Sequence, residues 1–332
     1  MAEPTRTPSA TARRRPVSRT IDVDGPVHVA DYGGPDDGPL LVAVHGLGGS
    51  HLDWLAVGPL LTRRSRLVAV DLLGHGRTPA AGRTPDMDGH RHVLDGVLRE
   101  LASGPVVLVG NSMGGLVCAL EAADRPAAVA GLVLVDPAIP AMGGPGIVHP
   151  RVLGNLLVCS IPGLGERFVD VWRRRTPARR SVEQTLRFCC VDAGRVPAEV
   201  VDALVELKAG VDRRSAELAY LRSVRSLTST MLRPATMARA LDASDRPVLL
   251  LHGDRDWLVP VGVARRLCAT RPNWELVEAR GVGHIPMLEV PELTADAVDT
   301  WLEGAGASAA AISRGTRTGR YRSASTHPSP AL

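Results

Sequence analysis

Ser112 stands at the centre of a Gly-x-Ser-x-Gly pattern, Gly110-Asn111-Ser112-Met113-Gly114, which could support nucleophilic chemistry. The residues just before it, 106–109, are apolar and mostly β-branched and predict a buried strand, whereas 116–123 offers strong helix formers. The local order is therefore strand, sharp turn, helix. A serine on such a turn is held in a strained conformation above the sheet edge, beside a helix N-terminus that favours developing negative charge.

Two further side chains could complete this chemistry, because a serine hydroxyl is a weak nucleophile and needs a base that a third group orients. His284 follows the last strand that we predict, in Gly281-Val282-Gly283-His284-Ile285-Pro286. Asp256 follows the strand before it, and Asp254 and Asp136 also lie at strand ends. The carboxyl ends of parallel strands meet at one edge of a sheet, so these loops are expected to converge.

The elements that must position these residues alternate between short apolar strands and helices. Residues 20–32 alternate apolar and polar around Asp24-Gly25, which predicts a β-hairpin. Further strands are predicted at 40–44, 66–70, 106–109, 132–135, 246–251 and 275–277, and helices at 88–102, 116–123 and 293–302. This order predicts an α/β fold with a parallel sheet that is covered on both faces.

Composition divides the chain into a core, an insertion and two tails. Residues 1–18 and 304–332 are rich in small and polar residues and are predicted to be disordered. The predicted α/β core comprises 19–139 and 241–303. Between its two parts, 140–240 shows helical runs such as 200–209 and 216–227 and no alternating strand, so we predict a helical insertion there.

Charge and composition exclude several other classes of protein. The formal charge of +4 comes from arginines that are thinly spread through the chain, with aromatic residues at only 3%, so no nucleic-acid partner is predicted. The five cysteines have no metal-ligand spacing, which indicates reduced thiols in a cytoplasmic protein and predicts no metal. No stretch reaches the ~18 apolar residues of a membrane span, and Arg13-Arg14-Arg15 is followed by polar residues instead of a signal peptide.

Four motifs, taken in chain order, resemble those of the α/β-hydrolase fold family, and more closely its capped serine esterases and lipases. They are His45-Gly46, the Ser112 turn, the Asp256 loop and the His284 loop, and the resemblance covers about residues 20–303. It implies a mostly parallel sheet of eight strands with helices on both faces and a helical cap inserted after the sixth strand. No cofactor is implied, and the partner would be a small-molecule ester or acyl substrate, with the oligomeric state left open.

The resemblance assigns catalytic roles residue by residue. Ser112 would be the nucleophile, His284 the base and then the acid, and Asp256 the orienting carboxylate. Asp256 matches the family pattern Gly-x-x-Asp before an apolar-Val-Pro run; Asp254 is then a turn residue and Asp136 a strand-end cap, although either could replace Asp256 as the acid.

Further residues would support these three or contact the substrate. The backbone N–H groups of Leu47 and Met113 would form the oxyanion hole. His45, Gly46, Gly110 and Gly114 would support the loops, and His75, in a Gly-His-Gly segment, is expected to brace a loop as well. Trp54 and Trp257 flank the presumed pocket, where packing in the core or under a lid is at least as well supported as substrate contact.

These assignments predict a serine hydrolase that cleaves a carboxylic ester of a small or lipid-like apolar substrate. Serine at 112 argues against dehalogenase and epoxide-hydrolase chemistry, because members of the family with those activities carry aspartate at this position of the turn. The Gly-Asn-Ser-Met-Gly-Gly sequence is similar to that of C–C hydrolases of ring-cleavage products. Those enzymes usually carry tryptophan after the catalytic histidine, whereas this chain has Ile285. Thioesterase, lactonase and perhydrolase activities share the same triad, and a non-catalytic ligand-binding homologue is the remaining alternative.

Overall fold

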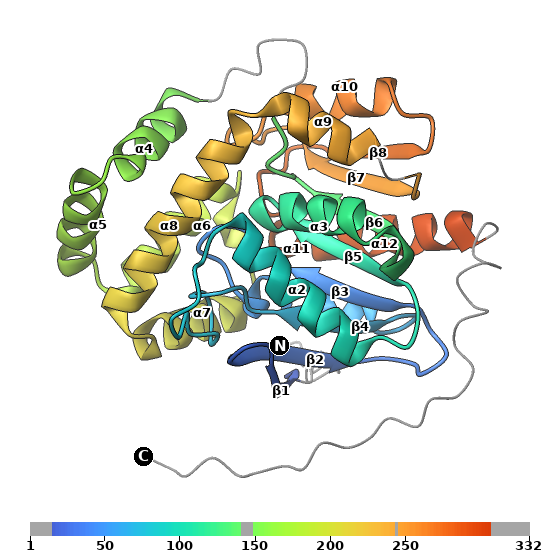
Figure 1. Cartoon of the computed structure of the whole chain (residues 1–332), viewed down its shortest axis with the longest axis horizontal. Helices are drawn as coiled ribbons and strands as arrows, with labels where there is room; N and C mark the ends of the chain where they lie inside the picture. Colours follow the sequence, from blue (N-terminus) through green and yellow to red (C-terminus); the bar gives the residue numbers. More distant parts are fainter. Residues whose placement is uncertain (1–14, 141–148, 243–244, 307–332) are drawn as a thin grey trace, which may run out of the picture.

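Eight strands form one sheet in the order β1-β2-β4-β3-β5-β6-β7-β8 in the computed structural model, which describes residues 15–140, 149–242 and 245–306 (Figure 1). The strands are β1 (Val17–Asp22), β2 (Pro26–Gly33), β3 (Leu40–Val44), β4 (Arg66–Val70), β5 (Val106–Asn111), β6 (Val129–Val135), β7 (Val248–Gly253) and β8 (Trp274–Ala279). The β1–β2 and β2–β4 pairs are antiparallel, and every pair from β4 onward is parallel. The predicted α/β fold is confirmed.

Both faces of the sheet are apolar, because alternate residues of each central strand point to opposite faces. Val42, Leu108 and Leu250 lie in one hydrophobic core, while their neighbours Leu41, Val109 and Leu249 lie in the other. This two-sided burial explains why the central strands read as continuous apolar runs instead of alternating ones. The first core packs against α2, α3, α9 and α10, and the second against α1, α12 and parts of α6 and α7.

The helices and their bounds follow the strands along the chain. Asp86 caps α2 by accepting a hydrogen bond from the Gly89 N–H at 2.8 Å, which fixes where that helix begins. The elements before β7 are η1 (His51–Trp54), α1 (Gly58–Leu61), α2 (Met87–Leu101), α3 (Met113–Asp124), η2 (Pro126–Ala128), α4 (Pro150–Ser160), α5 (Leu164–Arg175), α6 (Ala178–Cys189), η3 (Ala193–Arg195), α7 (Ala198–Gly210), α8 (Arg213–Met231) and α9 (Pro234–Asp242). After β7 come α10 (Gly262–Ala269), α11 (Pro286–Glu289) and α12 (Pro291–Gly306).

Helices α4 to α9 separate β6 from β7 in the chain, and α9 ends at Asp242, two residues after the predicted end of the insertion. That these helices form a separate cap stays a prediction. Figure 1 shows α4 and α5 beside the sheet, with α8 running between them and the helices that cover one of its faces. Ser223 of α8 is hydrogen-bonded to His90 of α2 at 2.9 Å. A small cluster joins them: Cys159 of α4 and Val169 of α5 pack against Leu221 and Val224 of α8.

Several predicted boundaries differ from the structure. Val17 and Ser18, assigned to the disordered N-terminal tail, belong to β1, where Val17 pairs with Asp31 and Ser18 with Ala30. The strand predicted to begin at 132 begins at Val129, because Gly131 had broken the apolar pattern. The last helix continues past the predicted end of the core to Gly306. The rest of the N-terminal tail, up to residue 14, and the C-terminal tail from 307 lie outside the described residues.

Candidate active site

Ser112 occupies a sharp turn between β5 and α3, with a φ of 51° and a ψ of −116° that L-residues rarely adopt. The flanking glycines are needed because the chain folds back closely on itself. A Cβ on Gly110 would lie 2.6 Å from the Gly114 carbonyl oxygen, and one on Gly114 would overlap the carbonyl oxygens of Val44 and His45. The Ser112 hydroxyl makes no hydrogen bond within the described residues and is partly exposed.

His284 and Asp256 form a buried pair at the ends of two neighbouring strands, β8 and β7. The His284 Nδ1 donates to Asp256 Oδ2 at 2.7 Å, and the two residues are 4% and 6% exposed. Burial alone would raise the pKa of Asp256, but the charge and hydrogen bond of His284 hold it below its usual value. The carboxylate is therefore ionised at neutral pH and accepts the Nδ1 proton of His284, so Nε2 is the ring nitrogen that can take a proton from another group.

The other two candidate acids take different positions. Asp254 Oδ1 accepts the Gly281 N–H at 2.7 Å, as a turn residue does. Asp136, with a φ of 45°, accepts the Gly253 N–H at 2.9 Å, and its other oxygen is buried without a partner in the described chain. Burial and the neighbouring charge of Asp256 raise the pKa of Asp136 well above its usual value, which favours the protonated carboxyl.

Two backbone N–H groups near Ser112 are available as donors. Met113 is the first residue of α3, so its N–H has no acceptor within the helix. The N–H of Leu47 likewise donates to no group in the described parts of the chain. A Cβ on Gly46 would meet the Ser112 Cβ at 3.2 Å, so the loop that carries Leu47 lies directly against the serine turn.

His45 holds this loop in place instead of facing a substrate. Its Nε2 accepts the Leu72 N–H at 3.0 Å, so the proton is on Nδ1, which donates to the Gly46 carbonyl at 2.7 Å. Burial lowers the pKa of His45 and keeps the ring neutral. His75 is buried too, with its Nδ1 against the Leu73 carbonyl at 2.9 Å.

Three groups that the sequence did not single out tie the site together. The Asn111 side chain donates to the backbone carbonyls of Val135 and His284, both at 3.1 Å, and so links the serine turn to the histidine loop. The Cys189 carbonyl, at the end of α6, accepts the His284 N–H at 2.7 Å. Buried Glu289 accepts the N–H of Gly283 at 2.9 Å and that of Asp192 at 2.9 Å. Only Asn111 carried a sequence signal, through its place beside Ser112.

The two tryptophans that we predicted to flank a substrate pocket have different surroundings. Trp54 is completely buried in the core on the α12 side of the sheet. Trp257 donates its Nε1 proton to the Phe188 carbonyl at 2.8 Å, and its ring packs edge-on against the rings of Phe188 and His149. Trp257 therefore links the Asp256 loop to α6, and a contact of either tryptophan with substrate stays a prediction.

Two clusters in the described ranges bring three metal-ligand side chains together: Asp136, His252 and Asp256, and a second formed by His28, His51 and Asp71. In the first, His252 Nε2 lies 2.8 Å from the Val259 carbonyl, to which it donates, so this nitrogen carries a proton and is not a ligand. In the second, Asp71 accepts the Nδ1 protons of His28 at 2.8 Å and His51 at 2.9 Å. Hydrogen bonds within the protein therefore already use the ring nitrogens of His28 and His51 that face Asp71, and the His252 nitrogen that faces Asp136 and Asp256.

Comparison with known proteins places this chain in a family. Residues 41–297 match the model of the alpha/beta hydrolase family. A pimeloyl-[acyl-carrier protein] methyl ester esterase of Aromatoleum aromaticum is 28% identical over 277 residues, which cover 80% of this chain and 99% of that protein. A human monoacylglycerol lipase is 26% identical over 287 residues, covering 83% and 81%.

Solved structures share the fold at lower identity. A haloalkane dehalogenase from Bradyrhizobium elkanii superposes with a TM-score of 0.74 at 23% identity, over 88% of this chain and 99% of its own. A thermophilic esterase from Thermogutta terrifontis gives a TM-score of 0.65 at 24% identity, over 88% and 99%. Because a dehalogenase and an esterase share this fold, the reaction that this chain catalyses depends on the side chains of its site.

Proposed function

Because the chain belongs to the alpha/beta hydrolase family, we propose that it is a serine hydrolase that cleaves carboxylic esters through an acyl-enzyme. The observation that carries this proposal is the buried His284–Asp256 pair, with its 2.7 Å hydrogen bond, in a loop that Asn111 ties to the strained Ser112 turn. Two similar proteins, the methyl ester esterase and the monoacylglycerol lipase, support an ester as the substrate.

Acylation uses the free nitrogen of His284. As the Ser112 Oγ attacks the ester carbonyl carbon, Nε2 takes the hydroxyl proton, and Asp256 stabilises the resulting imidazolium. The carbonyl oxygen becomes negative and accepts hydrogen bonds from the Met113 and Leu47 N–H groups. One such donor is worth about 2.7–4 kcal/mol of transition-state stabilisation. His284 then protonates the leaving alcohol, and the acyl group stays on Ser112.

Deacylation repeats these steps with water as the nucleophile. His284 removes a proton from the water as it attacks the acyl carbon, and returns that proton to Ser112 Oγ when the acid leaves. Dehalogenases and epoxide hydrolases proceed through an alkyl ester of an aspartate at this position of the turn. A serine there cannot form that intermediate. The helices α4 to α9 lie between β6 and β7, and we assign them the role of a cap over the carboxyl ends of the strands.

Labelling with a fluorophosphonate probe tests the proposal, because the probe reacts only with an activated serine. The wild-type chain should be labelled at Ser112, and Ser112→Ala should abolish labelling. Ser50→Ala is the matched control, since Ser50 is a buried serine of a neighbouring loop whose hydroxyl accepts the Leu52 N–H at 3.2 Å. A wild-type chain that stays unlabelled would favour the non-catalytic homologue.

A panel of p-nitrophenyl esters of rising chain length then sorts the substrates. Turnover that rises with chain length supports a lipid-like apolar acyl group, whereas a preference for acetate supports a small one. Labelling without turnover of any ester in the panel would move the proposal to thioesters or to C–C bonds, which the same triad can cleave.

A further inference from the structure

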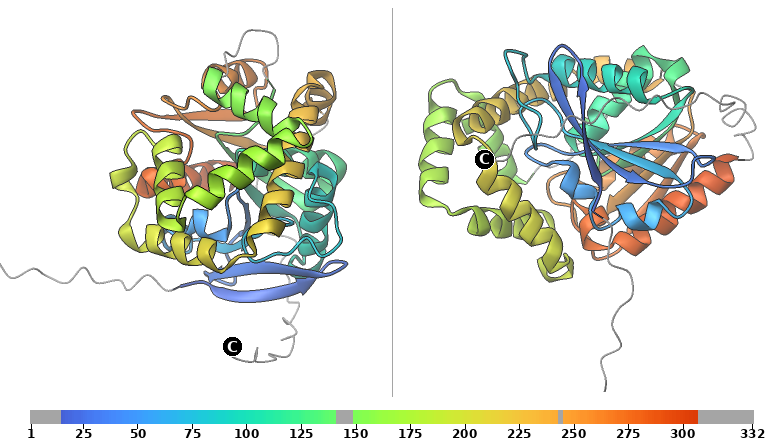
Figure 2. Two further views of the ribbon diagram at one scale, coloured as in Figure 1. Left: turned by 90° about the vertical axis from the view of Figure 1, so that its left-hand side faces the viewer. Right: turned by 90° about the horizontal axis from the view of Figure 1, so that it is seen from below.

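Helices α4 and α5 and the short link between them expose six large apolar side chains that we call the outer stripe: Leu153, Leu157, Ile161, Leu164, Phe168 and Trp172. Their exposures run from 37% to 54%, although residues of this kind are usually buried. The spacing of three or four residues places them on one face of each helix. In Figure 2 (left) α4 and α5 face the viewer, at the side of the molecule away from the sheet.

The inner face of the same helices supplies the packing that holds them in the fold. Cys159 and Val169 are 3% and 5% exposed and contact Leu221 and Val224 of α8. The outer stripe is therefore not needed for this cluster. An exposed apolar face of this length usually marks a surface that binds a partner.

Exposed arginines flank the α5 part of the stripe. Arg167 and Arg174 lie on one side of that part of α5, one helical turn before and after Val171, which is itself 42% exposed, and Arg175 ends the helix. Between 150 and 180 the only two carboxylates are both paired: Asp170 with Arg174 at 2.7 Å, and Glu166 with Arg225 at 2.8 Å.

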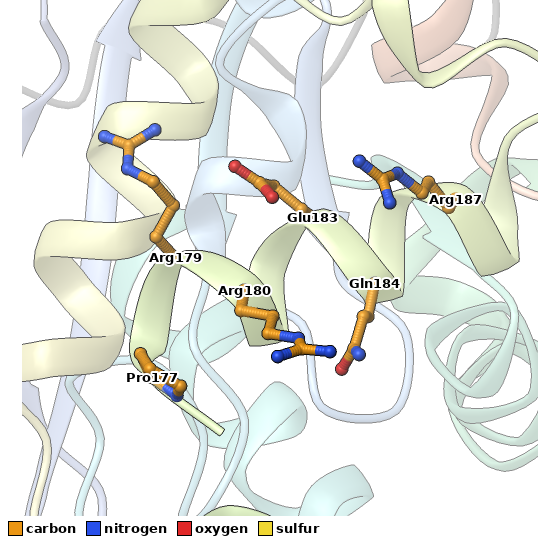
Figure 3. Close-up of a pocket in the computed structure, with 6 residues that line it drawn as sticks. All are labelled: Pro177, Arg179, Arg180, Glu183, Gln184 and Arg187. Carbon is orange, nitrogen blue, oxygen red and sulfur yellow. The ribbon is translucent and has the colours of Figure 1, made fainter. Parts of the chain in front are cut away.

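The positive charge continues into α6, which begins three residues after α5 ends. Figure 3 shows a surface hollow on α6 whose lining has three arginines and one carboxylate: Arg179, Arg180, Arg187 and Glu183. Arg179 is paired with Asp202 at 2.7 Å, whereas Arg180 extends to the opposite side of the helix, next to Gln184.

We propose that the outer stripe docks this protein onto the surface of a bilayer that contains anionic phospholipids. The apolar side chains would enter the boundary between headgroups and acyl chains, Trp172 would lie at that boundary, and the arginines would contact the phosphates. Among the described helices none alone is long and apolar enough to cross a bilayer; α4 and α5 meet that criterion only as a pair bent by 116°. The helices would therefore lie along the surface.

Docking at this face would place the bilayer close to the candidate active site. Leu47, whose N–H is a proposed oxyanion donor, packs against the same Cys159–Val169–Leu221–Val224 cluster from the side of the sheet. Helices α4 and α5, together with α8 beneath them, thus separate the outer stripe from the loop beside Ser112. Surface binding itself does not depend on the reactivity of Ser112.

Sedimentation of the full-length Ser112→Ala chain with vesicles tests the proposal without turnover of lipid. We expect binding to vesicles of phosphatidylcholine with 30% phosphatidylglycerol, a composition chosen for its negative surface, and much weaker binding to pure phosphatidylcholine. Leu157→Ser with Phe168→Ser should lower the partition coefficient about tenfold or more. Arg167→Gln with Arg175→Gln should lower it roughly fivefold per arginine at low salt.

Matched controls remove the same groups elsewhere on the surface. Val17→Ser with Leu232→Ser removes two exposed apolar side chains, which are 62% and 77% exposed. Arg63→Gln with Arg99→Gln removes two exposed arginines from the α/β core. Both control pairs should bind anionic vesicles as the parent does.

Three results would overturn the proposal: equal binding to neutral and anionic vesicles, equal loss in the control pairs, or no vesicle binding together with a dimer that the Leu157→Ser/Phe168→Ser pair dissociates. The last would assign the stripe to contact between copies of this chain, as light scattering would show. Absence of fluorophosphonate labelling would overturn the catalytic proposal alone and leave this one standing.

Discussion

Two buried carboxylates of this protein each bind histidine, but they leave those histidines in different states. Asp256 binds a single histidine at hydrogen-bond distance: it accepts the Nδ1 proton of His284 at 2.7 Å, besides the backbone N–H groups of Leu258 and Val259. The Nε2 of His284 has no partner in the described chain. Asp71 accepts Nδ1 protons from both His28 and His51 and also the backbone N–H groups of His51 and Arg77. His28 is held at its other nitrogen by Ser18 at 3.0 Å.

The difference shows how one pair of residue types serves two purposes. At Asp256 one imidazole nitrogen is anchored and the other is left for a substrate, which is what a general base requires. At Asp71 the hydrogen bonds converge from β2, η1 and the loop after β4, so the carboxylate joins three segments. The first arrangement predicts a loss of activity on mutation and the second a loss of stability.

Removing the charge of Asp256 should have the largest effect. We expect Asp256→Asn to lower kcat by about 10⁴-fold, because an amide would favour the wrong tautomer of His284 and could not stabilise the imidazolium. The Tm should change little by comparison. Steady-state kinetics and thermal melts of the same preparation measure both, and Asp254→Asn, a turn residue two positions away, should keep most of the activity. A full loss of folding in Asp256→Asn would remove the contrast between the two carboxylates.

Asp71→Asn should show the opposite pattern, a loss of about 3 kcal/mol in the free energy of unfolding with kcat retained in the folded fraction. Burial acts to raise the pKa of Asp71, but hydrogen bonds from His28 and His51 hold it well below its usual value. The carboxylate therefore stabilises the fold at neutral pH, and this contribution is lost as the pH falls below about 4.

Urea unfolding at pH 7 and at pH 3 measures this prediction, because the difference between Asp71→Asn and wild type should narrow at pH 3. Asp24→Asn is the control: Asp24 also binds a histidine, His92, at 2.8 Å, but at 78% side-chain exposure. It should change the free energy of unfolding by less than about 1 kcal/mol. An equal loss in the two variants would show that burial does not set the strength of the Asp71 cluster.

The comparison also shows what the sequence could predict. The Ser112 turn is a local pattern, a strand followed by Gly-x-Ser-x-Gly and a helix, and the structure has that order. The Asp71 cluster is not local, because its histidines lie 43 and 20 residues away along the chain and meet only after β2 and β4 pair.

The sequence of 140–240 predicts helices but does not locate α4 and α5. Their exposed leucines and aromatic residues lie outside the face that packs on the core, so the usual one-sided apolar pattern is hidden. The role of Glu289 was equally hidden, because its three backbone donors belong to two separate loops. Residues whose partners are distant in sequence need the fold before they can be interpreted.

Asp53 sharpens the comparison, since it lies on η1 beside the Asp71 cluster but has no histidine. Burial raises its pKa to about 7, against a hydrogen bond from Ser50 and with repulsion from Asp71 adding to the shift. A raised pKa means that the fold loses stability as the pH rises from about 4 to 7, where only the unfolded chain is ionised. The free energy of unfolding of Asp53→Asn should thus exceed that of wild type by roughly 1 kcal/mol at pH 8, after allowance for partial exposure, and should equal it at pH 4. A loss at pH 8 in urea unfolding would contradict this.

Asp136→Asn should have the smallest effect, and it decides which carboxyl carries the charge beside His284. Burial and the charge of Asp256 raise the pKa of Asp136 and so favour its neutral form, which an amide reproduces, and the amide oxygen can still accept the Gly253 N–H. We therefore expect kcat to stay within about threefold of wild type. A loss near that of Asp256→Asn would instead assign the orienting charge to Asp136, at the end of β6. The single-histidine geometry of Asp256 would then be a consequence of packing, and the contrast with Asp71 would hold for stability alone.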